Sequence, residues 1–115
     1  MLNIFLSFLP DKIFYINLNL IYLSLQGNDL NYLTNYSFYG LNNLIHLNLA
    51  RNRLQFSFNQ QPFQYLNSLK ILNLDRNLQM NITKNILNDL SKNLIELSLQ
   101  NCNLTKFNYS LEFLF

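Results

Sequence analysis

The leucines of this chain recur in a fixed frame of apolar and polar positions. The first full copy of the frame comprises Leu20, Leu23, Leu25, Asn28 and Leu30. Further copies begin at Leu44, Leu69 and Leu94, so successive starts lie 24, 25 and 25 residues apart. A period of this size predicts a solenoid, in which each unit buries its apolar side chains against its neighbours.

Each copy of the frame predicts one short strand. Side chains alternate along a strand, so Leu23 and Leu25 are expected to point inward and Ser24 outward. Strands of successive copies would pair in parallel and form a concave sheet. The opposite, convex side shows no sustained helical period, so we expect irregular structure or short 3-10 turns there. The stretch 84–92 is the nearest to a helix.

A polar residue ends each strand segment, where the chain turns and its backbone polar groups become buried. An Asn side chain offers two donors and one acceptor, so it can bond to the turns of its own and the adjacent repeat. We therefore expect a structural ladder, in which Cys102 takes the fourth slot as a small residue with a weak donor. Its members are Asn28, Asn52, Asn77 and Cys102.

The second half of each unit carries further apolar positions. They are Leu33, Phe38 and Leu41, then Phe58, Phe63 and Leu66 after a one-residue insertion, then Ile82, Leu87 and Leu90. Together with the L-x-x-L-x-L-x-x-N-x-L frame, these residues resemble the leucine-rich repeat family, in its Phe-containing extracellular type. Toll-like receptor ectodomains are similar. The resemblance implies an α/β-type solenoid, a right-handed coil with a parallel concave sheet.

The frame divides the chain into one repeat array over residues 1–115. We expect a partial repeat at 1–19, full repeats at 20–43, 44–68 and 69–93, and a partial repeat at 94–115. Neither end shows the cysteine-rich cap that extracellular members of the family usually carry. We therefore interpret the chain as an internal part of a longer solenoid, which could self-associate through uncapped ends.

Composition narrows the function. The chain has 27 Leu and 21 Asn but a net charge of only +2, which argues against a nucleic-acid partner. No stretch is apolar enough for a membrane span, and residues 1–10 lack a basic segment and a cleavage site typical of a signal peptide. We expect no cofactor and no metal site, because the chain has one Cys and one His.

The residues that could carry catalysis are better explained otherwise. His46 falls on the concave face with no acid placed beside it, which favours an exposed surface His over a catalytic or pH-sensitive one. Cys102 falls in the ladder without a neighbouring base or cation. The sequence therefore predicts a binding module and not an enzyme.

The concave face is the expected ligand-binding surface, because solenoids bind with it. The candidate residues are Tyr22, Ser24, Gln26, His46, Asn48, Arg51, Ile71, Asn73, Asp75, Arg76, Glu96, Ser98 and Gln100. Arg51, Arg53 and Arg76 gather at one edge with Asp75 among them. They are either a solvated edge that Asp75 partly neutralises or an anchor for an acidic ligand group.

Four N-x-S/T sequons occur, at Asn35, Asn81, Asn103 and Asn108, and they are either glycosylated or incidental in an Asn-rich chain. The preferred interpretation is an extracellular or cell-surface recognition module that binds a protein ligand or co-receptor. The alternative is a cytoplasmic leucine-rich repeat adaptor, which the lone Cys and the missing disulfide caps favour.

Overall fold

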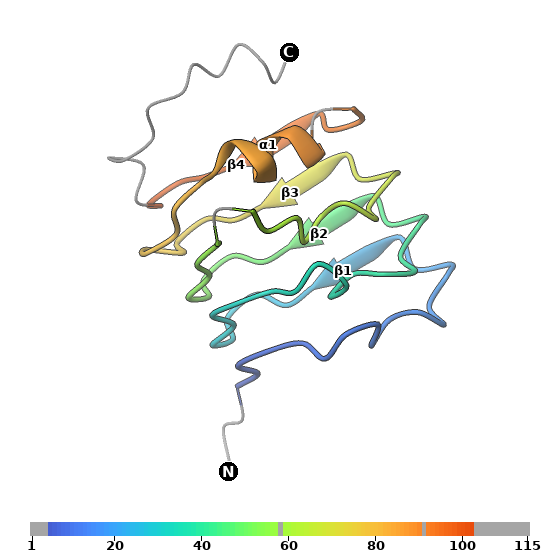
Figure 1. Ribbon diagram of the computed structural model, residues 1–115, viewed down its shortest axis with the longest axis horizontal. Helices are drawn as coiled ribbons and strands as arrows, with labels where there is room; N and C mark the ends of the chain where they lie inside the picture. The colour runs from blue at the N-terminus through green and yellow to red at the C-terminus, as the bar shows by residue number, and fades with distance from the viewer. Residues whose placement is uncertain (1–4, 58, 91, 103–115) are drawn as a thin grey trace.

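Four short parallel strands stack into one sheet. The computed structural model describes residues 5–57, 59–90 and 92–102. The strands are β1 (Tyr22–Ser24), β2 (His46–Asn48), β3 (Ile71–Asn73) and β4 (Glu96–Ser98), and each pairs with the next in chain order (Figure 1). Every turn of the chain therefore adds one strand to the same face, as the repeat frame predicts.

The alternation of side chains across the strands follows the predicted pattern. Leu47 and Leu72, the middle residues of β2 and β3, are fully buried, whereas the residues on either side of them face outward and are half-buried. Leu23, Leu47, Leu72 and Leu97 are direct partners across the sheet. Leucine holds all four positions because each side chain packs against the leucine of the neighbouring strand.

The side opposite the sheet consists mainly of single turns. Backbone bonds from residue i+3 to residue i close these turns, for example from Tyr39 N to Tyr36 O at 3.2 Å and from Leu41 N to Phe38 O at 3.2 Å. These bonds have the 3-10 pattern, but within the described residues they do not continue into a 3-10 helix. The expected 3-10 turns are therefore present as isolated turns, each closed by its own bond.

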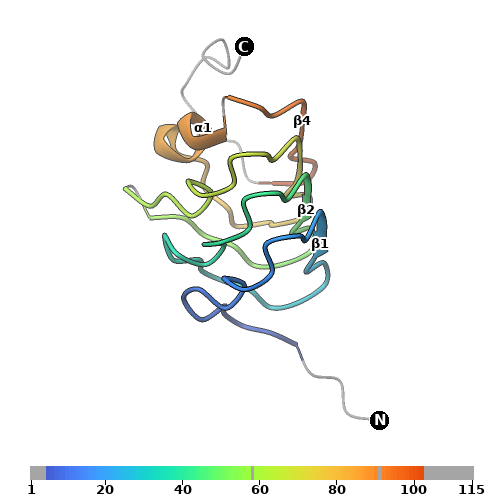
Figure 2. The ribbon, with the colours of Figure 1, turned by 90° about the vertical axis from the view of Figure 1, so that its right-hand side faces the viewer.

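One α-helix, α1 (Lys84–Leu90), replaces these turns in the third repeat and lies across the molecule from the sheet (Figure 2). The hydroxyl of Thr83 accepts a hydrogen bond from Ile86 N at 3.3 Å and so caps the first turn. Ile86, Leu87 and Leu90 form the buried side of the helix. The segment expected to be nearest to a helix is therefore helical over seven residues.

Aromatic rings form a column on the inner side of these turns. Phe38 stacks on Phe14 with ring centroids 6.4 Å apart and on Phe63 with centroids 6.0 Å apart. Phe56 is also buried and meets Phe63 edge-on at 5.9 Å, although the repeat frame does not mark it. Phe58, which the frame does mark, lies outside the described residues.

The third repeat departs from the frame after Asn77. Positions 30 and 54 of the first two repeats are buried leucines, and the frame places Gln79 at the same slot. The structure exposes Gln79 and buries Met80 instead. The turn is one residue longer here, because the apolar Met80 fills the core, where the polar Gln79 would leave its amide unpaired.

The first described residues follow the same period. Phe8 forms a parallel bridge with Tyr32, 24 residues on, and Leu9 is buried as Leu33 is. Gly40 is required at this junction, because its φ is +97° and a Cβ there would lie 2.6 Å from the Cα of Tyr15. Within the described residues, the structure has no helix of the length and apolarity that a bilayer crossing needs.

Candidate functional site

The outward side chains of the four strands form regular columns, here called the sheet face. The first column comprises Tyr22, His46, Ile71 and Glu96, and the centre column comprises Ser24, Asn48, Asn73 and Ser98. Backbone bonds extend the pairing by one more row, from Gly27 N to Ala50 O and from Arg51 N to Asp75 O. The structure therefore brings the candidate residues of the first two columns together on one surface.

The first column begins with an aromatic pair. The ring of Tyr22 meets the ring of His46 edge-on, with centroids 4.7 Å apart, and Tyr22 remains 52% exposed. Ile71 continues the column as a half-buried apolar residue, and Glu96 ends it as an exposed acid. An exposed aromatic beside an aliphatic residue is the kind of surface from which protein interfaces draw their binding energy.

Hydrogen bonds fix the polar side chains beside the first column. Asn48 donates to Gln26 Oε1 at 2.9 Å, and its own oxygen accepts from Ala50 N at 3.0 Å. The oxygen of Asn73 accepts from Asp75 N in the same way, at 2.9 Å. These bonds immobilise the centre of the sheet face before a ligand arrives, which lowers the entropy cost of binding.

Asp75 is held by the last strand. One of its carboxylate oxygens accepts from the hydroxyl of Ser98 at 2.6 Å and from Gln100 N at 2.7 Å. The acid that pairs with an arginine at this edge is Asp29, whose carboxylate lies 3.7 Å from Arg53 Nε. Among the described residues, the arginine at this edge that forms an ion pair is therefore Arg53, and its partner is the exposed Asp29 and not Asp75 as expected.

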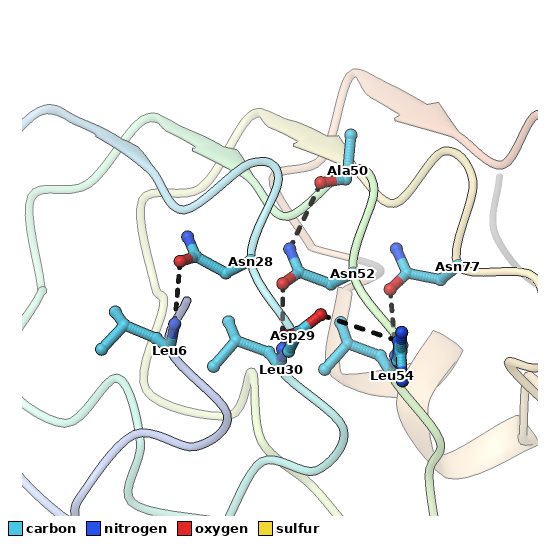
Figure 3. A network of polar contacts seen from close by, with 9 residues as sticks. Leu6, Asn28, Asp29, Leu30, Ala50, Asn52, Leu54 and Asn77 are labelled. Atoms are coloured by element: carbon cyan, nitrogen blue, oxygen red, sulfur yellow. Dashed lines mark hydrogen bonds and ion pairs between the residues drawn. The ribbon is translucent and has the colours of Figure 1, made fainter. Parts of the chain in front are cut away.

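The ladder residues occupy the turn beside the sheet (Figure 3). Asn52 accepts from Leu30 N of the preceding repeat at 3.0 Å and donates to Leu25 O and Leu49 O, each at 3.0 Å. Asn77 repeats this arrangement with Leu54 N at 3.0 Å. Both asparagines are buried. Each ladder side chain thus satisfies an amide N–H of the repeat before it.

The two ends of the ladder differ from its centre. Asn28 accepts from Leu6 N at 3.0 Å at an exposed position. Cys102 donates through sulfur to Leu74 O at 3.1 Å. Met80, the buried residue that follows Asn77, already gives its N–H to Asn77 O at 3.1 Å. An acceptor at position 102 is therefore dispensable, which explains why a cysteine suffices there.

Burial raises the pKa of one acidic side chain in the ladder and of one opposite the sheet. Burial raises the pKa of the Cys102 thiol, with the charge of Asp75 acting in the same direction, so the thiol is less reactive than a free cysteine. Burial also raises the pKa of Asp89. The Oδ2 atom of Asp89 is buried and has no hydrogen-bond partner within the described residues.

The chain turns out of the sheet through a left-handed residue in every repeat. The positions are Gly27, Arg51, Arg76 and Asn101, with φ of 74°, 57°, 60° and 57°. This backbone conformation favours glycine and tolerates asparagine, but for arginine it costs about 1–2 kcal/mol. The two arginines therefore have a backbone conformation that suits them less well than it suits Gly27 or Asn101.

The side chains around these turns line a groove, here called the exit-edge groove, with a volume of about 680 Å³. Its walls include the residues on both sides of Asn52 and Asn77, and Asp29 beside Asn28. They are Asp29, Arg51, Arg53, Gln55, Arg76, Leu78 and Gln79. The sequence analysis identified Arg51 and Arg76 as candidates but missed Leu78, Gln55 and Gln79. An alignment of the repeats over the residues around Asn28, Asn52 and Asn77 would have placed them at the same edge.

Two of the four sequons can be placed. Asn81 is exposed, and its oxygen accepts from Phe56 N at 3.1 Å. Asn35 is half-buried, and its oxygen accepts from Gln61 N at 2.8 Å. In both, the amide nitrogen that would carry a glycan is a different atom from the bonded oxygen. Asn103 and Asn108 lie outside the described residues.

Among the described residues, no three His, Cys, Asp or Glu side chains gather closely enough to hold a metal ion. The polar groups of the sheet face are engaged with one another, and His46 contacts the ring of Tyr22. What this arrangement offers chemically is a rigid surface of mixed character and a basic groove beside it.

Comparison with known protein families identifies the repeat independently of the structure. The model of the family described as leucine rich repeat matches residues 3–54 and, in an overlapping match, residues 19–78. The search of curated proteins gave no match to the chain.

Proposed function

Because the chain belongs to the leucine-rich repeat family, we propose that it is a non-catalytic module that binds a protein partner on the sheet face. The observation that carries this proposal is the first column, in which Tyr22, His46 and Ile71 stand side by side on adjacent strands. The paired strands already hold the backbone of this column in place, so less conformational entropy is lost when a partner binds. Its aromatic and aliphatic members can bury apolar area in a partner.

Selection from a library of displayed peptides and small domains, followed by affinity measurement, tests this proposal. Tyr22→Ala should weaken a selected binder at least about tenfold, as expected for an aromatic that dominates an interface. Tyr39→Ala is the matched control, because Tyr39 is a 38% exposed tyrosine that does not belong to the sheet. Its ring meets the ring of Tyr65 edge-on, with centroids 5.0 Å apart. Binders that respond only to the Tyr39 variant would contradict the proposal.

The repeat type also bears on the cellular setting. We propose that the chain is part of an extracellular or cell-surface receptor, of the kind that Toll-like receptors represent. The Phe38–Phe63 column, which is typical of extracellular repeats, supports this, and so does the sequon at Asn35. A mass shift on enzymatic deglycosylation of the protein from its natural source would agree with it. An unglycosylated protein in the cytoplasmic fraction would instead favour the adaptor.

A further inference from the structure

The exit-edge groove has an excess of positive charge that the fold does not use. The side chain of Arg53 pairs with Asp29 and is still 77% exposed. The guanidinium groups of Arg51 and Arg76 are exposed and make no hydrogen bond or ion pair with the described residues. Three arginines against one aspartate leave a net charge of +2 on this groove, which equals that of the whole chain.

The backbone conformation of Arg51 and Arg76 also indicates a functional role for these two residues. Gly27 and Asn101 occupy the equivalent positions with nearly the same φ, so the fold accepts residues that suit a left-handed conformation. Arginine is more strained there, and strain of this kind commonly marks a functional position. We therefore infer that arginine stands at positions 51 and 76 for the sake of its side chain, despite the strain in the backbone.

The groove continues into apolar surface. Leu78, which is 65% exposed, Gln55 and Gln79 also line a second hollow of about 820 Å³. Tyr32 and Phe56 also line this second hollow. The two glutamines stand where basic and apolar walls meet, and their amides can both donate to and accept from an extended backbone.

We propose that the exit-edge groove binds an extended acidic peptide segment of a protein partner. Aspartate or glutamate carboxylates pair with Arg51 and Arg76, and an apolar side chain further along the segment contacts Leu78 and Tyr32. Arginine pairs with carboxylates in a bidentate geometry, which selects them over diffuse negative charge. The apolar end favours a peptide over a polyanion such as a nucleic acid or a sulfated polysaccharide, since these offer no aliphatic side chain.

This inference rests on the proposed recognition function and adds a second contact surface to it. The probe is a fluorescein-labelled peptide of four glutamates followed by leucine and phenylalanine, measured by fluorescence anisotropy at low salt. A peptide with glutamines in place of the glutamates and a single-stranded oligonucleotide are measured beside it. The glutamate peptide should bind most tightly, and added salt should weaken it.

The decisive variant combines Arg51→Asn with Arg76→Asn. It introduces the residue that already stands at Asn101, so the melting temperature should stay the same or rise. Binding of the glutamate peptide should fall about tenfold or more and lose salt dependence. The matched control, Lys84→Asn with Lys92→Asn, removes the same charge at α1 and beyond it. It should leave binding within about twofold, since distant exposed charges are screened.

A variant that gains affinity provides an independent test. Asp29→Asn releases Arg53 from its exposed partner, so the glutamate peptide should bind several-fold more tightly. Equal losses in the two double variants would overturn the inference, as would tighter binding of the oligonucleotide through the same arginines. The two proposals can fail separately. A peptide that binds here while Tyr22→Ala has no effect on selected binders would remove the sheet-face site alone, and the reverse result would remove the groove alone.

Discussion

Replacing Asn52 by alanine removes the centre of the ladder. The Asn52 side chain accepts from Leu30 N and donates to Leu25 O, Leu49 O and Ala50 O. The three carbonyls each retain another donor: Leu25 O has Asn28 Nδ2, Leu49 O has Asn77 Nδ2, and Ala50 O has Gly27 N. Only the N–H of the fully buried Leu30 is left without a partner.

The expected cost follows from these partners. A buried N–H without an acceptor costs about 1–3 kcal/mol, and each lost hydrogen bond contributes about 0.5–1.5 kcal/mol net. Because each carbonyl keeps another donor, we count only the unpaired N–H, and we expect Asn52→Ala to lower the free energy of unfolding by at least about 1–3 kcal/mol. Asn28→Ala should cost less, since Leu6 is exposed and its N–H can bond to water.

Urea unfolding followed by circular dichroism measures these differences, and Asn48→Ala is the control. Asn48 is half-buried on the sheet face, so water can replace its bond to Gln26 and can reach the part-buried Ala50 N–H that bonds to its oxygen. Its loss should cost about 1 kcal/mol or less. If Asn48→Ala and Asn52→Ala shifted the urea midpoint equally at an unchanged slope, the ladder would not carry the stability assigned to it here.

Three further predictions concern the remainder of the chain. Gly40→Ala should destabilise by at least about 2 kcal/mol, because the new Cβ meets the backbone of Tyr15, whereas Gly27→Ala should cost about 1 kcal/mol, since nothing lies within 4 Å of a Cβ there; similar urea midpoints for the two would contradict this. Burial raises the pKa of Asp89 in the folded state, so the fold binds this proton more tightly than the unfolded chain and loses stability as pH rises from the ordinary aspartate pKa through the raised value. Asp89→Asn should abolish that loss, so its advantage in urea midpoint should grow over this pH window; an advantage that shrinks with pH would show the opposite sign. Finally, the exposed Phe5, Phe8 and Ile21 leave an apolar surface beside β1, and we expect residues 1–115 to self-associate until a polar repeat is appended; a concentration-independent monomer in analytical ultracentrifugation would refute this.

The repeat frame predicted the strand register and the residue columns, because these depend only on which side chains are buried. Leu47 and Leu72 must point into the solenoid, and the spacing of their copies then sets the strand register, so the columns from Tyr22 to Glu96 could be derived before any coordinates. The parallel sheet and the family are confirmed. The assignment of the sheet face as a binding surface stays a prediction.

The frame failed where several residues compete for one place. Met80 enters the core in place of Gln79, which depends on the length of a turn and not on a period. The helix α1 is too short to be stable alone and forms because Ile86 and Leu87 pack against the core. The partner of Arg53 was also unpredictable, since long exposed side chains choose among nearby charges with little difference in energy.

The bonds from Asn52 to Leu30 N and from Asn77 to Leu54 N also bear on how such a chain can evolve. Each bond joins one turn directly to the next, whatever length of chain connects them on the far side. An insertion opposite the sheet, between Leu30 and Leu44, therefore lengthens a loop without breaking a rung, and duplication of a whole unit adds a rung already complete. Variation in structure is tolerated opposite the sheet, as the exchange of turns for α1 shows, while the spacing of the strand and its turn stays fixed. The sheet face can thus be extended one unit at a time while every unit keeps the same core.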